Sequence, residues 1–230
     1  MRRKGTGMIT GIASTAAPQA STAPGRWAAV LFDVDGVILD SGNAHRAAWH
    51  EWARRRGLDP HEVHATTQGR RRADILQLLA PDRPVVDEHQ LLDELMATHE
   101  AGISTYPGAP DLLASLSNWG VVTSSRGIAV TTRFRSLGLP VPDVRICAED
   151  VPEGKPSPAG YLAAAAALGA DPARCLVIED SPAGIEAGRG AGCTVYGVAT
   201  THTPEALSRA HVVFATLQDG ASHIKAGATK

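Results

Sequence analysis

The stretch AAVLFDVDG at residues 28–36 decides the fold of this chain. Its first five residues form an unbroken apolar run, which is typical of a strand buried on both faces of a parallel sheet. The run ends at two carboxylates, Asp33 and Asp35, followed by Gly36. Because like charges at this spacing repel and shift each other's pKa, the pair favours a bound cation, a shared proton, or both. An acidic turn that faces water is the plain alternative.

Further short apolar runs recur along the chain, each followed by polar or glycine-containing residues. They lie at residues 120–122, 144–147, 175–178, 194–198 and 211–214. Helix-like stretches lie among them, at 109–118, 157–168 and 183–190. Strand alternating with helix predicts an α/β fold, a doubly wound, Rossmann-like parallel sheet. Because such sheets bind ligands outside the carboxyl ends of their strands, the residues after each run are the candidates for chemistry.

Residues 42–108 break this alternation, because they carry helical patterns and no convincing strand. We therefore predict a small all-helical cap domain inserted after the first strand, with the α/β catalytic core at residues 26–41 and 109–230. Residues 1–25 are rich in Gly, Ala, Ser, Thr and Pro and offer little to pack. Such a segment cannot offset its own ordering entropy, so we expect a disordered leader.

The composition narrows the classes of partner. The 230 residues are 43% hydrophobic and 20% charged, with a formal net charge of -2. That balance offers no excess of positive charge for a phosphate backbone, so nucleic acid is not expected as a partner. No window approaches the roughly 18 apolar residues of a membrane helix, and the start lacks the apolar run of a secretory signal. We expect a cytoplasmic protein that binds no membrane, and its state as monomer or homodimer stays open.

Three later segments place polar side chains at positions like that of the first acidic pair. The second apolar run leads into Thr123 and Ser124, whose hydroxyls and amides can hold an anionic oxygen, so Ser124 is a candidate substrate contact. The fourth run ends in another acidic pair, Glu179 and Asp180, suited to a hard cation. Lys155 lies between these segments in a turn stiffened by Gly and Pro. Together these groups suit phosphoryl transfer: Mg²⁺ neutralises the phosphate, lysine and hydroxyl hold it, and a carboxylate attacks phosphorus.

These four segments, in this order, resemble the four motifs of the haloacid dehalogenase superfamily, from residue 28 to about residue 213. The resemblance implies that Asp33 is the nucleophile, which forms an aspartyl-phosphate. It implies that Asp35 is first the general acid for the leaving alkoxide and then the base that activates water. It also implies that Thr123 and Lys155 hold the transferring phosphoryl group.

The same resemblance implies a Mg²⁺ site. Asp33, Asp180 and the backbone carbonyl of Asp35 would bind the ion, and Glu179 would support it directly or through water. Asp35 also separates branches of the superfamily, because its dehalogenases lack an acid there while its phosphatases and phosphomutases have one. The insert resembles the helical cap of the branch with β-phosphoglucomutase, sugar phosphatases and glycerol-phosphate phosphatases. The expected function is Mg²⁺-dependent hydrolysis of a small sugar or polyol phosphate.

Two features of the insert bear on the substrate. The sequence QGRRR at residues 68–72 places Arg70 and Arg71 where they could meet an anionic or hydroxylated substrate, although a solvated basic turn would read the same way. His45 stands at the distance from the nucleophile at which β-phosphoglucomutase carries a histidine, which keeps a hexose phosphomutase open as an alternative. The chain shows no clear counterpart of the mutase's cap lysine. We therefore expect a phosphatase rather than a mutase.

Overall fold

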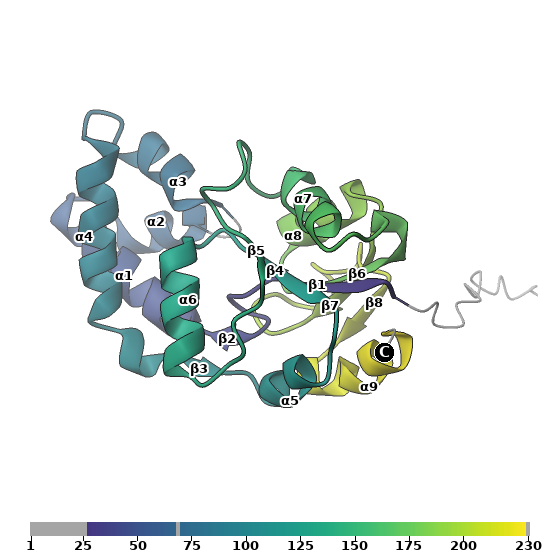
Figure 1. Cartoon of the computed structure of the whole chain (residues 1–230). Helices are drawn as coiled ribbons and strands as arrows, with labels where there is room; N and C mark the ends of the chain where they lie inside the picture. Colours follow the sequence, from purple (N-terminus) through teal and green to yellow (C-terminus); the bar gives the residue numbers. More distant parts are fainter. Residues whose placement is uncertain (1–26, 68–69, 229–230) are drawn as a thin grey trace, which may run out of the picture.

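A six-stranded parallel sheet lies at the centre of the structure (Figure 1). The computed structural model describes residues 27–67 and 70–228, so the predicted leader at residues 1–25 lies outside the described residues. The strands are β1 (Ala29–Phe32), β4 (Trp119–Val122), β5 (Val144–Ile146), β6 (Cys175–Glu179), β7 (Thr194–Val198) and β8 (Val212–Phe214). Their order is β5-β4-β1-β6-β7-β8. Because β1 lies between β4 and β6, the acidic pair that follows it leaves the sheet near its centre.

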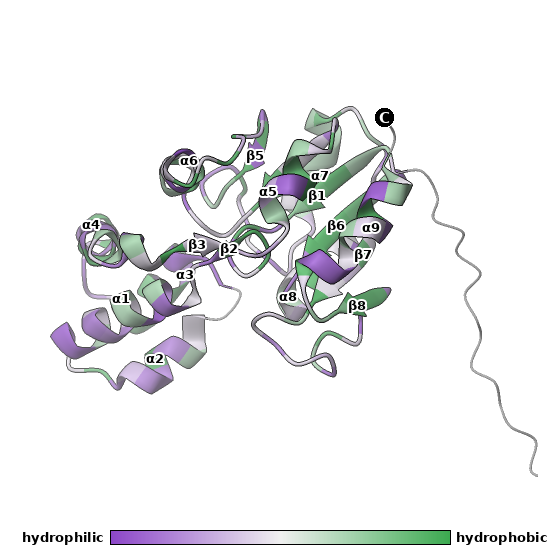
Figure 2. Ribbon diagram, turned by 90° about the horizontal axis from the view of Figure 1, so that it is seen from below, coloured by the Kyte–Doolittle hydropathy of each residue, from purple (hydrophilic) through white to green (hydrophobic). Residues whose placement is uncertain are grey.

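Helices cover both faces of this sheet. Successive residues of a strand point to opposite sides, and an apolar strand such as β1 therefore needs cover on both faces. The helices are α5 (Ala109–Ala114), α6 (Gly127–Ser136), α7 (Ala159–Ala167), α8 (Pro182–Gly190) and α9 (Leu217–Gly227), with a 3₁₀ turn, η2, at Pro172–Arg174. In β1, Ala29 and Leu31 belong to one buried hydrophobic cluster, which is covered by α7 and α8. Val30 and Phe32 belong to a second cluster on the other face, which is covered by α5, α6 and α9. Figure 2 shows the hydrophobic residues gathered on the strands between these layers. The predicted doubly wound α/β fold is confirmed.

A group of four helices lies beside the carboxyl end of the sheet (Figure 1). These are α1 (Gly42–Arg55), α2 (Pro60–Thr67), α3 (Arg72–Leu79) and α4 (Val85–Ala97), followed by a 3₁₀ turn, η1, at Glu100–Gly102. We call α1–α4 the helical segment and the sheet with α5–α9 the α/β part. The strands β2 (Leu39–Asp40) and β3 (Ser104–Thr105) form a short antiparallel ribbon where the chain enters and leaves the helical segment. The division into domains at residues 42 and 108 stays a prediction.

The helical segment has its own buried polar contact. Trp52 is fully buried, and its indole N–H donates to Oε2 of Glu88 at 2.7 Å. The guanidinium of Arg56 pairs with the same carboxylate at 2.8 Å. Because a buried charge needs partners of this kind, the triad fixes α1 against α4.

The structure adds elements that the sequence patterns did not predict. The two residues of β3 lie within the stretch that was expected to hold no strand, and a strand this short leaves no periodicity to detect. The helices α6 and α9 were also missed. The helix α2 lies within the stretch that was predicted to be helical, although only Val63 in it is buried and its sequence shows little apolar pattern. None of the helices in the described ranges is long and apolar enough to cross a membrane.

Candidate active site

A pocket of about 350 Å³ lies between the carboxyl end of the sheet and the helical segment. On the α/β side it is lined by the residues that follow β1, β4, β6 and β7, together with Lys155. On the other side it is lined by residues of α1, α2, α3 and α4 and of the turn before α3. All ten residues singled out in the sequence as candidate site residues lie in or beside this pocket. They are Asp33, Asp35, His45, Arg70, Arg71, Thr123, Ser124, Lys155, Asp180 and Glu179.

Three buried carboxylates and one lysine form the floor of the pocket. Oxygen atoms of Asp33, Glu179 and Asp180 lie within 4.8 Å of one another. The ammonium of Lys155 lies 2.6 Å from Oδ1 of Asp33 and 2.5 Å from Oε1 of Glu179. It also donates to the carbonyl of Val122 at 3.2 Å. One ammonium against three carboxylates leaves this buried cluster with excess negative charge.

The pKa values reflect that excess. Burial raises the pKa of Asp33 well above its usual range, and the neighbouring acids raise it further while Lys155 opposes them. Burial, helped by Glu179, raises the pKa of Asp180 to about 7. Burial lowers the pKa of Lys155, but Asp33 and Glu179 more than compensate and bring it above its usual value. Without a cation, these clustered carboxylates resist ionisation because they are buried and close together. A hard divalent cation prefers carboxylate oxygens as ligands and would stabilise their ionised forms, so these residues fit Mg²⁺.

The loop after β1 is shaped to meet Asp180. Gly36 has a φ of +92°, a backbone conformation that residues with a side chain rarely adopt. A Cβ atom at this position would lie 2.0 Å from Oδ2 of Asp180. The hydroxyl of Thr201, after β7, donates to the same oxygen. The carboxylate of Asp180 is thereby fixed between two loops.

Glu179 is held by more donors than the sequence suggested. The phenol of Tyr161, on α7, donates to Oε1 at 2.7 Å. The hydroxyl of Ser181 donates to Oε2 at 3.0 Å, and two backbone N–H groups at the start of α8 donate to the same oxygen. Tyr161 was not singled out in the sequence, because an aromatic residue in an alanine-rich helix reads as ordinary core.

Asp35 is not part of the carboxylate cluster. Its Oδ1 accepts from Ser41 at 2.6 Å and lies 3.3 Å from Nε2 of His45, and its Oδ2 accepts from Ser125 at 2.7 Å. The guanidinium of Arg133 lies 3.6 Å from Oδ1. Burial raises the pKa of Asp35, but His45, Arg133 and Ser41 outweigh it and hold that pKa well below its usual range. The structure therefore brings together His45 and Asp35, which the sequence had singled out separately as candidate site residues.

Thr123 and Ser124 both line the pocket directly after β4. Thr123 is buried, and its hydroxyl oxygen accepts from the N–H of Ser125 at 3.0 Å. The hydroxyl proton of Thr123 is therefore free to point elsewhere, which suits a group that donates to an anionic oxygen.

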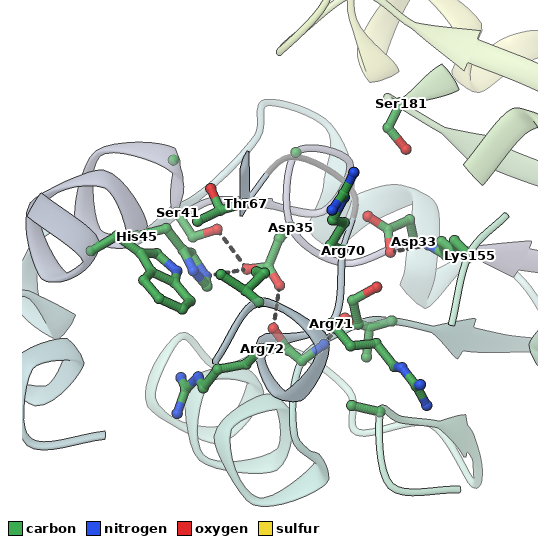
Figure 3. A pocket seen from close by; sticks show the side chains of 18 of the residues that line it. Asp33, Asp35, Ser41, His45, Thr67, Arg70, Arg71, Arg72, Lys155 and Ser181 are labelled. Carbon is green, nitrogen blue, oxygen red and sulfur yellow. Dashed lines mark hydrogen bonds and ion pairs between the residues drawn. The ribbon is translucent and has the colours of Figure 1, made fainter. Parts of the chain in front are cut away.

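The arginines before α3 reach the pocket in different ways (Figure 3). Arg70 and Arg71 both line it. The guanidinium of Arg71 pairs with Asp74 at 2.9 Å and donates to the carbonyls of Val151 and Pro152 at 3.1 and 3.0 Å. Arg71 therefore clasps the helical segment to the loop before Lys155, and most of its donors are already used.

Known proteins resemble this chain over most of its length. A family model described as haloacid dehalogenase-like hydrolase matches residues 27–192. Hexitol phosphatase A of Escherichia coli (strain K12) is 39% identical over 196 residues, which cover 82% of this chain and 90% of that protein. Glycerol-1-phosphate phosphohydrolase 2 of Saccharomyces cerevisiae is 35% identical over 187 residues, 75% of each chain. The crystal structure of CbbY from Rhodobacter sphaeroides in complex with phosphate has a TM-score of 0.73 at 26% identity, covering 84% of this chain and 96% of that chain.

Proposed function

We propose that this chain, which belongs to the haloacid dehalogenase-like hydrolase family, is a Mg²⁺-dependent phosphatase for a small sugar or polyol phosphate. The observation that carries the proposal is the buried cluster of Asp33, Glu179 and Asp180 around the ammonium of Lys155. The named relatives support the substrate class, because one is a hexitol phosphatase and another a glycerol-1-phosphate phosphohydrolase.

In this proposal Asp33 is the nucleophile. Its carboxylate attacks phosphorus, the ester P–O bond breaks, and the phosphoryl group is carried as an aspartyl-phosphate. Lys155, whose ammonium lies 2.6 Å from Asp33, and Thr123, which lines the same pocket, hold the phosphoryl oxygens. Asp33 and Asp180 would hold Mg²⁺ with the carbonyl of Asp35. When bound, the ion supplies positive charge that neutralises the phosphate and lowers the pKa of Asp33 and Asp180.

Asp35 moves the protons. It protonates the leaving alkoxide, and afterwards it takes a proton from the water that hydrolyses the aspartyl-phosphate. Its low pKa keeps the carboxylate ionised in the free enzyme, which is the protonation state that the second role requires. For the first role, a dianionic phosphate bound beside it raises its pKa, since a like charge disfavours the ionised form. Ser41 and Ser125 hold the carboxylate at the side of the pocket where a leaving group would lie.

The helical segment covers the site in this proposal. Ser41, at the start of α1, and Arg71, before α3, both contact residues of the α/β part or its loops. Enclosing the pocket would exclude water from the reacting phosphate and strengthen its contacts with the charged groups. We propose that this segment acts as the cap domain predicted from the sequence.

The test is release of inorganic phosphate from a panel of sugar, polyol and nucleotide monophosphates, with and without Mg²⁺. Asp33→Asn removes the nucleophile and is measured alongside. Release that needs both Mg²⁺ and Asp33 supports the proposal and ranks the substrates. No release from any ester, with protein shown to be folded, contradicts it.

A hexose phosphomutase is the second candidate, and the contact between His45 and Asp35 favours it. A mutase would convert one sugar phosphate into its isomer, would need a bisphosphate activator, and would release phosphate slowly. A coupled assay with that activator separates the two functions. Isomer formed faster than phosphate would favour the mutase.

A further inference from the structure

A carboxylate of the helical segment bridges two arginines that line the pocket. Oδ1 of Asp93, on α4, lies 2.5 Å from Nη1 of Arg72, and Oδ2 lies 2.6 Å from Nη1 of Arg126. Arg72 is the first residue of α3, and Arg126 directly precedes α6. The bridge therefore joins the helical segment to the α/β part. Nothing in the phosphoryl-transfer chemistry accounts for it.

The bridged arginines lie where the rest of a substrate would reach. The phosphate end of a substrate belongs at Asp33 and Lys155, on the floor of the pocket. Arg72 and Arg126 line the same pocket together with His89 of α4. Figure 3 shows Arg72 and Lys155 at opposite sides of the view of the site. The part of the substrate that projects toward the helical segment meets this arginine pair.

The carboxylate of Asp93 decides what the pair can bind. Two guanidinium groups without a counter-charge would form a site for a second anion, since arginine pairs readily with carboxylate and phosphate. Asp93 occupies one donor of each arginine and offsets one of their two positive charges. The remaining N–H groups still donate to uncharged oxygens such as hydroxyls.

We propose that Asp93 is a specificity-determining residue that restricts the pocket to phosphate esters whose far end is uncharged, such as a polyol chain. This inference rests on the proposed phosphatase function and names the substrate class of the same site. It predicts that an ester with a second anionic group at its far end is a poor substrate because Asp93 repels it and withholds the arginines from it.

The probes are two monophosphates of equal chain length. Sorbitol 6-phosphate ends in an uncharged hydroxymethyl group, and 6-phosphogluconate ends in a carboxylate. Their ratio of kcat/KM is measured on the same protein sample, so partial unfolding affects both equally and cancels. Dissociation constants for both, measured by calorimetry in the Asp33→Asn protein, give a second ratio that needs no turnover.

Asp93→Asn keeps the shape of the side chain and removes its charge. We expect the ratio of kcat/KM to shift toward 6-phosphogluconate by about tenfold or more, the equivalent of one charge-assisted hydrogen bond. The matched control is Glu51→Gln. Glu51 also bridges two arginines of the helical segment, Arg54 and Arg55, and its side chain is 38% exposed against 43% for Asp93, but neither of those arginines lines the pocket. The control should leave the ratio unchanged.

Each outcome decides the inference. A shift in both ratios with Asp93→Asn and none with Glu51→Gln supports it. A wild-type protein that prefers 6-phosphogluconate, or an Asp93→Asn protein with the wild-type ratios, overturns it. If the wild type hydrolyses no ester at all, the proposed function fails, and the ratio of dissociation constants still decides the role of Asp93.

Discussion

Replacing Tyr161 with phenylalanine tests how the buried carboxylate of Glu179 is held. The phenol donates to Oε1 of Glu179 at 2.7 Å, and both side chains are fully or almost fully buried. The same oxygen lies 2.5 Å from the ammonium of Lys155. Phenylalanine keeps the ring, which belongs to the hydrophobic cluster under α7 and lies 5.5 Å from that ammonium. The substitution therefore removes one donor and little else.

The expected cost follows from the charge of the acceptor. A hydrogen bond to a buried charged group contributes about 1.5–3 kcal/mol. Because Glu179 keeps its other donors, we expect a loss of about 2 kcal/mol in the free energy of unfolding. For a chain of this length that lowers the Tm by roughly 4–8 °C. With Oε1 less firmly placed, Lys155 shifts relative to the phosphoryl group, and we expect kcat/KM to fall about tenfold.

Thermal melts and steady-state kinetics are run beside Tyr196→Phe. Tyr196 is a half-buried tyrosine of β7 that packs edge-on against Trp27 and Phe214, away from the pocket. The control should keep the wild-type kcat/KM. If Tyr161→Phe melts within about 1 °C of the wild type and keeps its kcat/KM, the reasoning about Glu179 is refuted.

Three further predictions concern the acceptors and loops of the structure. Glu88→Ala leaves Arg56 and the buried indole N–H of Trp52 without their partner. We expect the free energy of unfolding, measured by urea denaturation, to fall by roughly 3–5 kcal/mol. An unchanged midpoint would contradict this. Gly36→Ala places a Cβ atom 2.0 Å from Oδ2 of Asp180 and should abolish phosphate release. The control Gly169→Ala also has a positive φ, +64°, but no atom lies within 4 Å of the added Cβ, so it should retain phosphate release. Equal activities of the two variants would exclude the clash with Asp180 as the cause. Burial raises the pKa of Asp180 to about 7 from 3.8, so its contribution to the stability of metal-free protein is present below pH 3.8 and lost as pH rises through 7. The Tm should therefore fall from about pH 4 to pH 8 and recover when Mg²⁺ is added at pH 8, and a Tm at pH 8 that ignores Mg²⁺ would argue against the metal site.

The floor of the pocket could be predicted because its acidic residues lie at the ends of single strands. Asp33 and Asp180 each follow an apolar run, and parallel strands bring such positions to one edge of the sheet. Lys155 was found through its stiff turn and its place in the order of motifs. In each case the signal lies within a few neighbouring residues, so one sequence is enough to predict that these side chains share a pocket.

The partners of those residues could not be predicted in the same way. Tyr161 reaches Glu179 across 18 positions, and Asp93 reaches Arg126 across 33. Arg133, which is buried beside Asp35, lies on a helix that was itself missed. Each of these contacts depends on how two elements pack, and no local pattern records that. Single charged residues on helices therefore read as solvated surface until the fold places them.

Glu179 shows how such contacts change the role that a motif suggests. Its two oxygens offer about four sites for hydrogen bonds, yet five donors surround them: Lys155, Tyr161, the hydroxyl of Ser181 and two backbone N–H groups. A Cβ on Gly184 would lie 1.8 Å from Oε1, so the carboxylate is seated against the first turn of α8 and has no room to turn. A direct bond from Glu179 to a cation would require one donor to leave. We therefore expect Glu179 to act as the counter-ion that places Lys155, so that its loss weakens phosphate binding more than Mg²⁺ binding, while loss of Asp180 does the reverse.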